Sequence, residues 1–177
     1  QLHKEYLIEN GLTGRAVDIY RKQGTKLGWE FSDKDVPSFP FEGGNIDAPV
    51  MLFEDPPEDN DIDGTYVSGL DHYKHNKAST NSLGANYIFK RNVNLDEWSD
   101  RVVACYYARP ETIEKFNNIN EMLIEGYGAE CLQENADISF EQHLKAKHKL
   151  HFLANGEELA KRLINPRASH NNKYGLN

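Results

Sequence analysis

The sequence predicts an α/β domain with a mixed sheet and flanking helices, preceded by a helical and irregular N-terminal segment. Three strand-like stretches follow one another between residues 65 and 109, and polar stretches of roughly ten residues separate them, which is typical of an antiparallel meander. Beyond residue 109 the apolar residues recur with the spacing of a helix instead of a strand. A short strand and a second helix are expected after that helix, which completes the α/β pattern.

The beginning of the chain has the least regular pattern. Residues 2–22 carry apolar residues at helical spacing, interrupted by "NGLTG" at residues 10–14, and predict a pair of helices without a core of their own. We therefore expect a helical and irregular segment over residues 1–48 and the main domain over residues 49–177, beginning with an edge strand in "APVMLF". The acidic stretch "FEDPPEDNDIDG" (53–64) is expected to be a solvated linker.

The three strands of the meander are expected in "TYVSGLD" (65–71), "SLGANYIFKR" (82–91) and "RVVACYYAR" (101–109). In the first of them Val67, Gly69 and Asp71 share one face, because side chains alternate between the two faces of a strand. We expect this series to point inward, with Gly69 leaving room beside the carboxylate of Asp71.

The helical spacing after the meander covers residues 110–129. A strand is expected next in "AECLQEN" (129–135), and because a crossover helix precedes it, that strand should run parallel to a neighbour in the sheet. A second helix is expected over residues 139–154, entered through Ser139, with Gln142 completing a capping-box pattern.

The composition excludes several classes of protein. Hydrophobic residues make up 38% of the chain and charged residues 27%, which is typical of a globular protein and not of a disordered or membrane one. No apolar run approaches the roughly 20 residues that cross a bilayer. Cys105 and Cys131 lie in apolar strand-like runs and are expected to be buried free thiols in a reducing, intracellular setting. Because the chain starts at Gln1, we expect it to be a piece of a longer protein.

The charge is distributed unevenly along the chain. The net charge is −8, yet residues 141–177 hold 7 Lys and Arg against 3 Asp and Glu. This C-terminal part could present a basic surface to the phosphates of DNA, which needs Lys and Arg density without sequence specificity. The candidate DNA-binding residues are Lys145, Lys147, Lys149, Lys161, Arg162 and Arg167. The alternative is an ordinary solvated helix face.

Three motifs in this order resemble the nuclease domain of phage and prophage large terminase subunits. The first strand ends in G-x-D at Asp71, the third strand is followed by "RPET" (109–112) at the start of a helix, and the fourth strand ends in "EN" at Glu134. The resemblance covers about residues 49–175. It implies a ribonuclease-H-like fold and a divalent-metal-dependent endonuclease that cuts concatemeric viral double-stranded DNA during genome packaging. It further implies an ATPase domain in the parent protein, small terminase and portal as partners, no membrane, and the host bacterial cytoplasm.

Asp71 and Glu134 are the candidate catalytic and metal-binding residues. Glu134 lies at the carboxyl end of its strand, and if the two strands are neighbours, as in the resembled fold, both carboxylates converge over the sheet. Two such carboxylates repel unless a cation lies between them, and oxygen ligands favour Mg²⁺ or Mn²⁺. A pair of these cations can activate a water and stabilise the leaving oxygen in phosphodiester hydrolysis. Asp137 could supplement or replace Glu134, while Asp71 as a turn cap and Glu134 as a solvated carboxylate are the alternatives.

The chain departs from the terminase pattern at the third acid. Terminase nucleases generally bring it from beyond the second helix, where this chain offers only Glu157 and Glu158 in a stretch that reads as a helical surface. We therefore expect the third ligand to lie beyond residue 177 or to be lost, with weak metal binding and slow cleavage by this chain. His72 and His75 are expected in an exposed loop, with a role in metal or substrate contact as the alternative. His143, His148 and His151 are expected on the surface of the second predicted helix.

Two rival functions stay open at this point. One is a nonenzymatic ribonuclease-H-like module that grips DNA or docks on a motor partner. The other is a different nuclease of the same fold, such as a junction resolvase or integrase relative. The sequence contains no G-x-x-x-x-G-K-[ST] stretch, so ATP hydrolysis is not expected of this chain.

Overall fold

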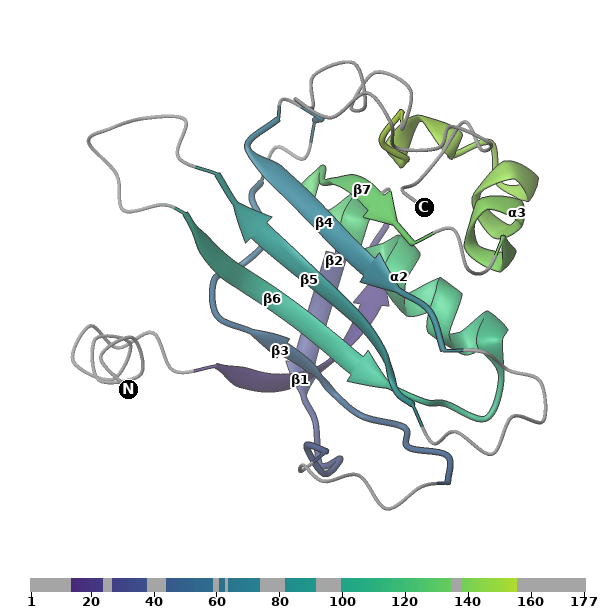
Figure 1. The fold of residues 1–177 in the computed structure, drawn as a ribbon. Coiled ribbons are helices and arrows are strands. Elements are labelled where there is room, and N and C mark those ends of the chain that lie inside the picture. The colour runs from purple at the N-terminus through teal and green to yellow at the C-terminus, as the bar shows by residue number, and fades with distance from the viewer. Residues whose placement is uncertain are drawn as a thin grey trace.

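A seven-stranded mixed sheet organises the chain, with strand order β2-β1-β3-β6-β5-β4-β7 (Figure 1). The computed structural model describes residues 14–23, 27–37, 44–58, 61–62, 64–73, 82–91, 100–134 and 138–155. The strands are β1 (Arg15–Arg21), β2 (Leu27–Phe31), β3 (Val50–Leu52), β4 (Tyr66–Asp71), β5 (Gly84–Lys90), β6 (Arg101–Ala108) and β7 (Glu130–Gln133). The helices are α2 (Ile113–Tyr127), α3 (Ser139–Ala146) and the 3-10 turn η1 (Leu150–Phe152). The predicted α/β class with a mixed sheet is confirmed.

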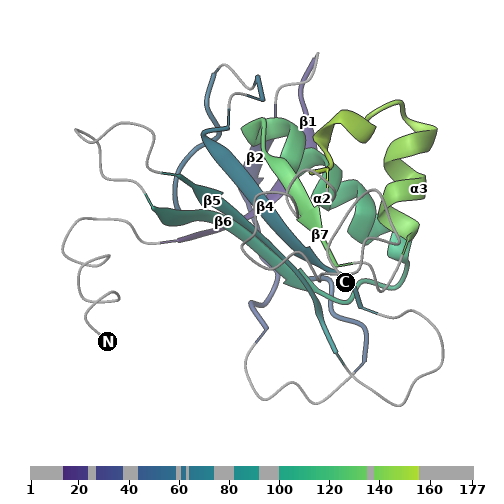
Figure 2. The same ribbon diagram turned by 45° about the horizontal axis from the view of Figure 1, so that its top comes forward.

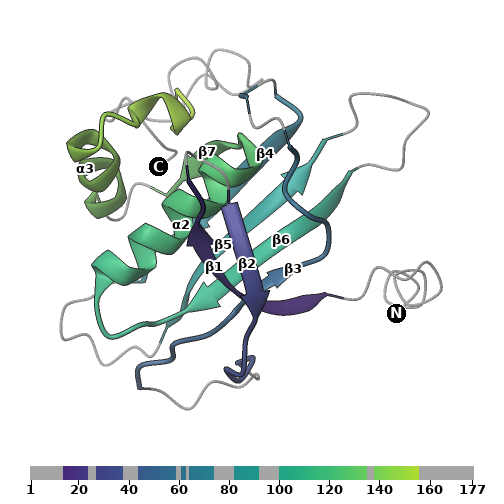
Figure 3. The ribbon, with the colours of Figure 1, turned by 180° about the vertical axis from the view of Figure 1, so that it is seen from behind.

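The meander and the crossover follow the predicted order. Strands β4, β5 and β6 pair antiparallel in sequence, with Tyr87 of β5 between Gly69 and Cys105. Helix α2 then carries the chain across one face of the sheet, as Figure 3 shows, and β7 pairs parallel with β4. The crossover helix thereby places the carboxyl ends of β4 and β7 side by side.

The helices predicted over residues 2–22 are wrong for the part that the structure describes. Residues 15–21 form β1, which pairs antiparallel with β2 and with β3, and β3 pairs with β6. Val17 and Ile19 are β-branched and fit an alternating pattern as well as a helical one, and the hydrogen bonds offered by β3 decide between the two. The sheet thus crosses the domain boundary expected at residue 49. Residues 1–13 lie outside the described part.

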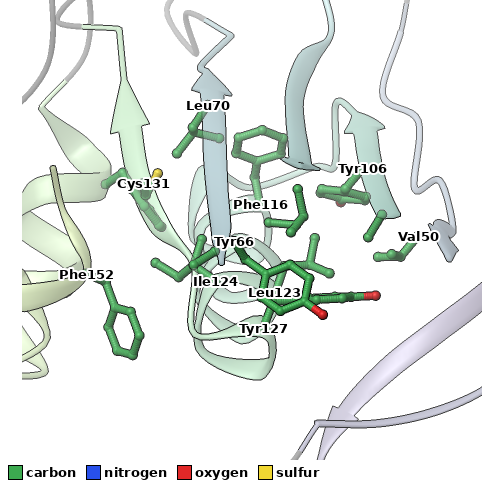
Figure 4. Packing of buried hydrophobic residues seen from close by; sticks show 14 of the residues in the cluster. Val50, Tyr66, Leu70, Tyr106, Phe116, Leu123, Ile124, Tyr127, Cys131 and Phe152 are labelled. Carbon is green, nitrogen blue, oxygen red and sulfur yellow. The ribbon is translucent and has the colours of Figure 1, made fainter. Parts of the chain in front are cut away.

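Helix α2 has both of its ends capped. The Thr112 hydroxyl accepts a hydrogen bond from the Lys115 N–H at 3.3 Å, and Gly128 ends the helix in the left-handed conformation with φ of 59°. The helix buries one face against the sheet, where its apolar residues meet those of β4, β5 and β6 (Figure 4). The labelled members of this core include Tyr66, Leu70, Tyr106, Phe116, Leu123, Ile124 and Tyr127.

Helix α3 is shorter than predicted and lies beyond β7, beside α2 (Figure 2). It begins at Ser139 with Ile138 as the cap residue, so the predicted capping box does not form. It ends at Ala146, and His148 then adopts a φ of 59°, which breaks the helix before η1. The chain returns to the sheet through a parallel bridge between Leu153 and Cys131.

Candidate functional site

The two predicted acidic residues lie next to each other at the carboxyl ends of adjacent parallel strands. Asp71 is the last residue of β4, and Glu134 directly follows β7. Leu70 pairs with Gln133, and the Glu134 N–H donates a hydrogen bond of 3.0 Å to the Leu70 carbonyl. The parallel register therefore aligns Asp71 with Glu134, on strands whose backbones are about 4.8 Å apart.

Both carboxylates border one surface depression. Its volume is about 390 Å³, and both acidic residues are exposed there. The lining residues are Gly69, Leu70, Asp71, Ala85, Tyr87, Leu132, Gln133 and Glu134. The arrangement can hold a hard cation between two oxygen-bearing side chains that come from different strands.

The prediction that the Asp71 series points into the core is wrong. On β4 the buried residues are Tyr66, Ser68 and Leu70, which face α2, whereas Gly69 and Asp71 are exposed on the opposite side. We call that side the outer face; it carries Val67, Gly69, Asp71, Ala85, Tyr87, Phe89 and Leu132. None of the described helices covers it (Figure 1). An alternating pattern does not tell which side of a strand a helix will cover, because both sides of β4 carry apolar residues.

A buried histidine, His72, directly follows β4 and holds the end of this strand in place. The His72 ring lies 5.7 Å from the ring of Phe116 and 5.6 Å from that of Phe140. The prediction of an exposed loop residue is thus wrong for His72, while His75 lies outside the described residues. Two helices therefore clamp the residue that directly follows Asp71, which restricts the movement of the carboxylate's backbone.

A buried chain of hydrogen bonds, which the sequence reasoning missed, runs beneath the same strand. The Ser68 hydroxyl donates to Asn86 Oδ1 at 2.6 Å, and the Asn86 amide donates to Asn120 Oδ1 at 3.0 Å. Asn120 in turn donates to the Phe116 carbonyl at 3.0 Å. Ser68, Asn86 and Asn120 could have been found from the sequence as polar residues at core-facing positions, because buried polar groups need hydrogen-bond partners. These hydrogen bonds connect β4 and β5 to α2.

The carboxylates of Asp71 and Glu134 are ligands of the type that Mg²⁺ and Mn²⁺ prefer, but there are only two of them among the residues that line the depression. Mg²⁺ commonly binds one or two carboxylates and keeps several of its waters, which suits two exposed acidic residues at a depression open to solvent. Within the described ranges, no group of three or more His, Cys, Asp and Glu side chains is close enough together to hold a metal ion. Asp137, Glu157 and Glu158 lie outside those ranges. A third protein ligand stays a prediction.

Two of the predicted DNA-binding lysines contact acidic residues of α2. The Lys147 ammonium lies 2.6 Å from Glu121, and the Lys149 ammonium lies 2.7 Å from Glu121 and 2.7 Å from Glu125. Lys145 is exposed on α3. Lys161, Arg162 and Arg167 lie outside the described residues.

Glu121 is the centre of this ionic cluster and is buried, with 1% of its side chain exposed. Besides both lysines it contacts Arg21 of β1 at 2.5 Å and His143 of α3 at 2.6 Å. Burial by itself would raise the pKa of Glu121, but the hydrogen bonds from Lys147, Lys149 and His143 lower that pKa to about 2. The cluster, which we call the Glu121 cluster, therefore joins β1, α2 and α3.

Arg109 of the "RPET" motif and Glu54 of the acidic stretch both have structural roles. The Arg109 guanidinium donates to the Ser82 carbonyl at 2.8 Å and lies over the ring of Tyr73. Glu54, expected in a solvated linker, instead forms ion pairs with Lys90 and Arg101. The linker prediction is therefore wrong at that residue.

The two cysteines match the prediction of buried free thiols. Neither forms a disulfide, and both are buried in strands of the sheet. Burial raises the pKa of Cys105 to about 11 and that of Cys131 to about 12, so both thiols are protonated at neutral pH.

Comparisons of the chain with protein-family models, with curated proteins and with solved structures found no match. No described helix has the length and apolar character to cross a bilayer.

Proposed function

We propose that the chain is the nuclease domain of a large-terminase-type protein, with a ribonuclease-H-like fold and divalent-metal-dependent endonuclease activity on viral double-stranded DNA. One observation carries the proposal. Asp71 and Glu134, far apart in sequence, end adjacent parallel strands and border the same depression. Convergent carboxylates on a rigid sheet are the protein's contribution to metal-assisted phosphodiester hydrolysis.

The topology supports the proposal. An antiparallel meander, a crossover helix and a fourth strand parallel to the first give the local order β6-β5-β4-β7, which is the arrangement that the resemblance implies. The parallel bridge at Leu153 continues the pattern beyond β7. Strands β1, β2 and β3 extend the opposite side of the sheet.

In the proposed site, Asp71 and Glu134 would hold Mg²⁺ or Mn²⁺, which would supply activation of a water and stabilisation of the leaving oxygen. The chain's own residues keep the carboxylates in place. The hydrogen bond from the Glu134 N–H to the Leu70 carbonyl fixes the position of β7 along β4. The ring contacts of His72 with Phe116 and Phe140 hold the end of β4 in place. A rigid arrangement matters because small displacements of catalytic groups cost large factors in rate.

Contact with duplex DNA is proposed through Lys145 and through Lys161, Arg162 and Arg167. Lys147 and Lys149 are weaker candidates than the sequence alone indicated, because their ammonium groups already contact Glu121. The ATPase domain, the small terminase and portal partners, and the host bacterial cytoplasm belong to the same proposal.

The test is nicking of a supercoiled plasmid with Mn²⁺, with Mg²⁺ and with EDTA. We expect metal-dependent nicking that falls about a hundredfold in Asp71→Asn and in Glu134→Gln, the scale of losing a group that acts in the transition state. Glu114→Gln is the matched control, since Glu114 is an exposed carboxylate in the first turn of α2 and is not among the residues that line the depression. It should change the rate by no more than about twofold.

Calorimetric titration with Mn²⁺ tests the site even where nicking is slow. Asp71→Asn should lose most of the Mn²⁺ binding while its circular dichroism stays that of the wild type. Equal Mn²⁺ affinity in wild type and Asp71→Asn would refute the metal site. Metal binding and DNA binding without any nicking would favour the nonenzymatic module instead.

A further inference from the structure

The depression at the carboxylates continues along the outer face into a second one. The second depression has a volume of about 430 Å³ and lies over the middle of β4, β5 and β7. It is lined by Val67, Ser68, Gly69, Tyr87, Phe89, Val102, Glu130, Leu132 and Ala154. Gly69, Tyr87 and Leu132 line both depressions, which therefore form one groove. We call it the face groove.

Tyr87 and Gly69 form the centre of the face groove. They are directly opposite each other in the antiparallel register of β4 and β5. Tyr87 is 47% exposed, and a Cβ atom on Gly69 would meet nothing within 4 Å. A glycine inside a strand often marks a place where a ligand approaches the backbone closely. The ring of Tyr87 thus borders open space of a size that a flat group can enter.

The chemistry of the groove changes along its length. Its middle is formed mostly by apolar side chains and the Tyr87 ring, with the carboxylate of Glu130 as its one acidic side chain, whereas its end carries the carboxylates of Asp71 and Glu134. A complementary ligand has a flat apolar part beside a part that binds a cation. A nucleotide has both, since its base stacks on aromatic rings and its phosphate binds divalent cations.

We propose that the face groove binds an unpaired base of a DNA strand, stacked on Tyr87, beside the phosphate that lies at Asp71 and Glu134. This inference rests on the proposed nuclease function and adds a substrate class to it. In an intact duplex the faces of the bases are covered by their neighbours, so only a single-stranded, frayed or locally opened strand can use the groove. Tyr87 is then the residue that determines specificity for unpaired DNA.

Binding of a fluorescein-labelled ten-residue oligothymidylate, measured by anisotropy with Ca²⁺ present, tests the groove apart from cleavage. Tyr87→Ala removes the ring, and Gly69→Val fills the space beside it with a residue that suits a strand. Each should weaken binding about tenfold or more, and Tyr87→Phe, which keeps the ring, should bind like the wild type. Tyr20→Ala is the matched control, because Tyr20 of β1 is 44% exposed and lies outside the groove.

The possible outcomes separate this inference from the proposed function. A chain that does not nick plasmid but binds the oligonucleotide through Tyr87 supports the groove and refutes the nuclease. Equal affinity in wild type, Tyr87→Ala and Gly69→Val overturns the groove, and so does tighter binding of a blunt duplex or no oligonucleotide binding at all. If the wild type is a dimer and Tyr87→Ala is a monomer, a second copy of the chain occupies the face groove. A large loss of thermal stability in Tyr87→Ala without DNA shows that the face is covered within the chain. Either result overturns the proposal.

Discussion

Removing the charge of Glu121 should destabilise the protein in a pH-dependent way. The change from the ordinary pKa of 4.5 to about 2 corresponds to about 3 kcal/mol in favour of the folded state at neutral pH. Because the pKa is lowered on folding, this contribution is complete above about pH 5 and is lost as the pH falls towards 2. Glu121→Gln should therefore lower the free energy of unfolding by about 3 kcal/mol at pH 7.

Urea denaturation followed by circular dichroism at pH 7, 5 and 3 measures this effect. The difference between wild type and Glu121→Gln should shrink by about half between pH 7 and pH 3, since the wild-type carboxylate loses its advantage in that range. Glu114→Gln is the control, because Glu114 is exposed in the first turn of the same helix. A difference that does not change with pH, or an equal loss in Glu114→Gln, would refute the assignment of the stability to the Glu121 cluster.

The remaining predictions concern the lysines of the C-terminal part, the buried hydrogen bonds of Asn86 and the two cysteines. Lys149→Ala should lower the free energy of unfolding by roughly 1.5 to 3 kcal/mol, because Lys149 contacts two buried carboxylates. Lys145→Glu should leave the stability unchanged and reduce the salt dependence of duplex DNA binding. Urea denaturation and salt titrations of DNA binding measure the two effects, and the reverse pattern would contradict the contacts of Lys149. Asn86→Ala should cost roughly 1 to 3 kcal/mol in thermal unfolding, since it leaves the buried Ser68 and Asn120 groups without their partner; an unchanged melting temperature would show that this chain of hydrogen bonds is dispensable. Cys105 and Cys131 should resist iodoacetamide at pH 8 in the native protein and react in urea, as mass spectrometry would show, and alkylation before unfolding would mean that the thiols are accessible.

The core of the fold could be predicted because its signals are local. The alternation in the three meander strands, the stripe on α2 and the punctuation by glycine at its end each need only a short window of sequence. The helix predicted over residues 15–21 fails for the opposite reason. Val17 and Ile19 become strand residues through pairing with β3, which lies far along the chain, and no local pattern contains that information.

In the candidate site, too, some residues could be predicted from the sequence and others could not. Strand-end positions and the resemblance identified Asp71 and Glu134. The crossover rule predicted that β7 runs parallel to a neighbour, and the resemblance implied that this neighbour is β4. Lys147 and Lys149, by contrast, looked like surface charges, because their partner Glu121 lies on α2 and no local sequence pattern shows that contact. The break at His148 also matters, since it lets both lysines reach one carboxylate. Charge alone does not distinguish a lysine that meets phosphate from one that is neutralised internally.

The meeting of Asp71 and Glu134 depends on the direction of β7. If β7 ran antiparallel to β4, its carboxyl end would lie beside Tyr66, at the opposite end of β4 from Asp71. The crossover through α2 makes β7 parallel, so both strands end at the same edge of the sheet. The same register places Leu132 beside Gly69 and Gly69 beside Tyr87, which aligns the face groove with the carboxylates. One topological feature therefore supplies both the proposed cation site and the surface that would hold the base next to it.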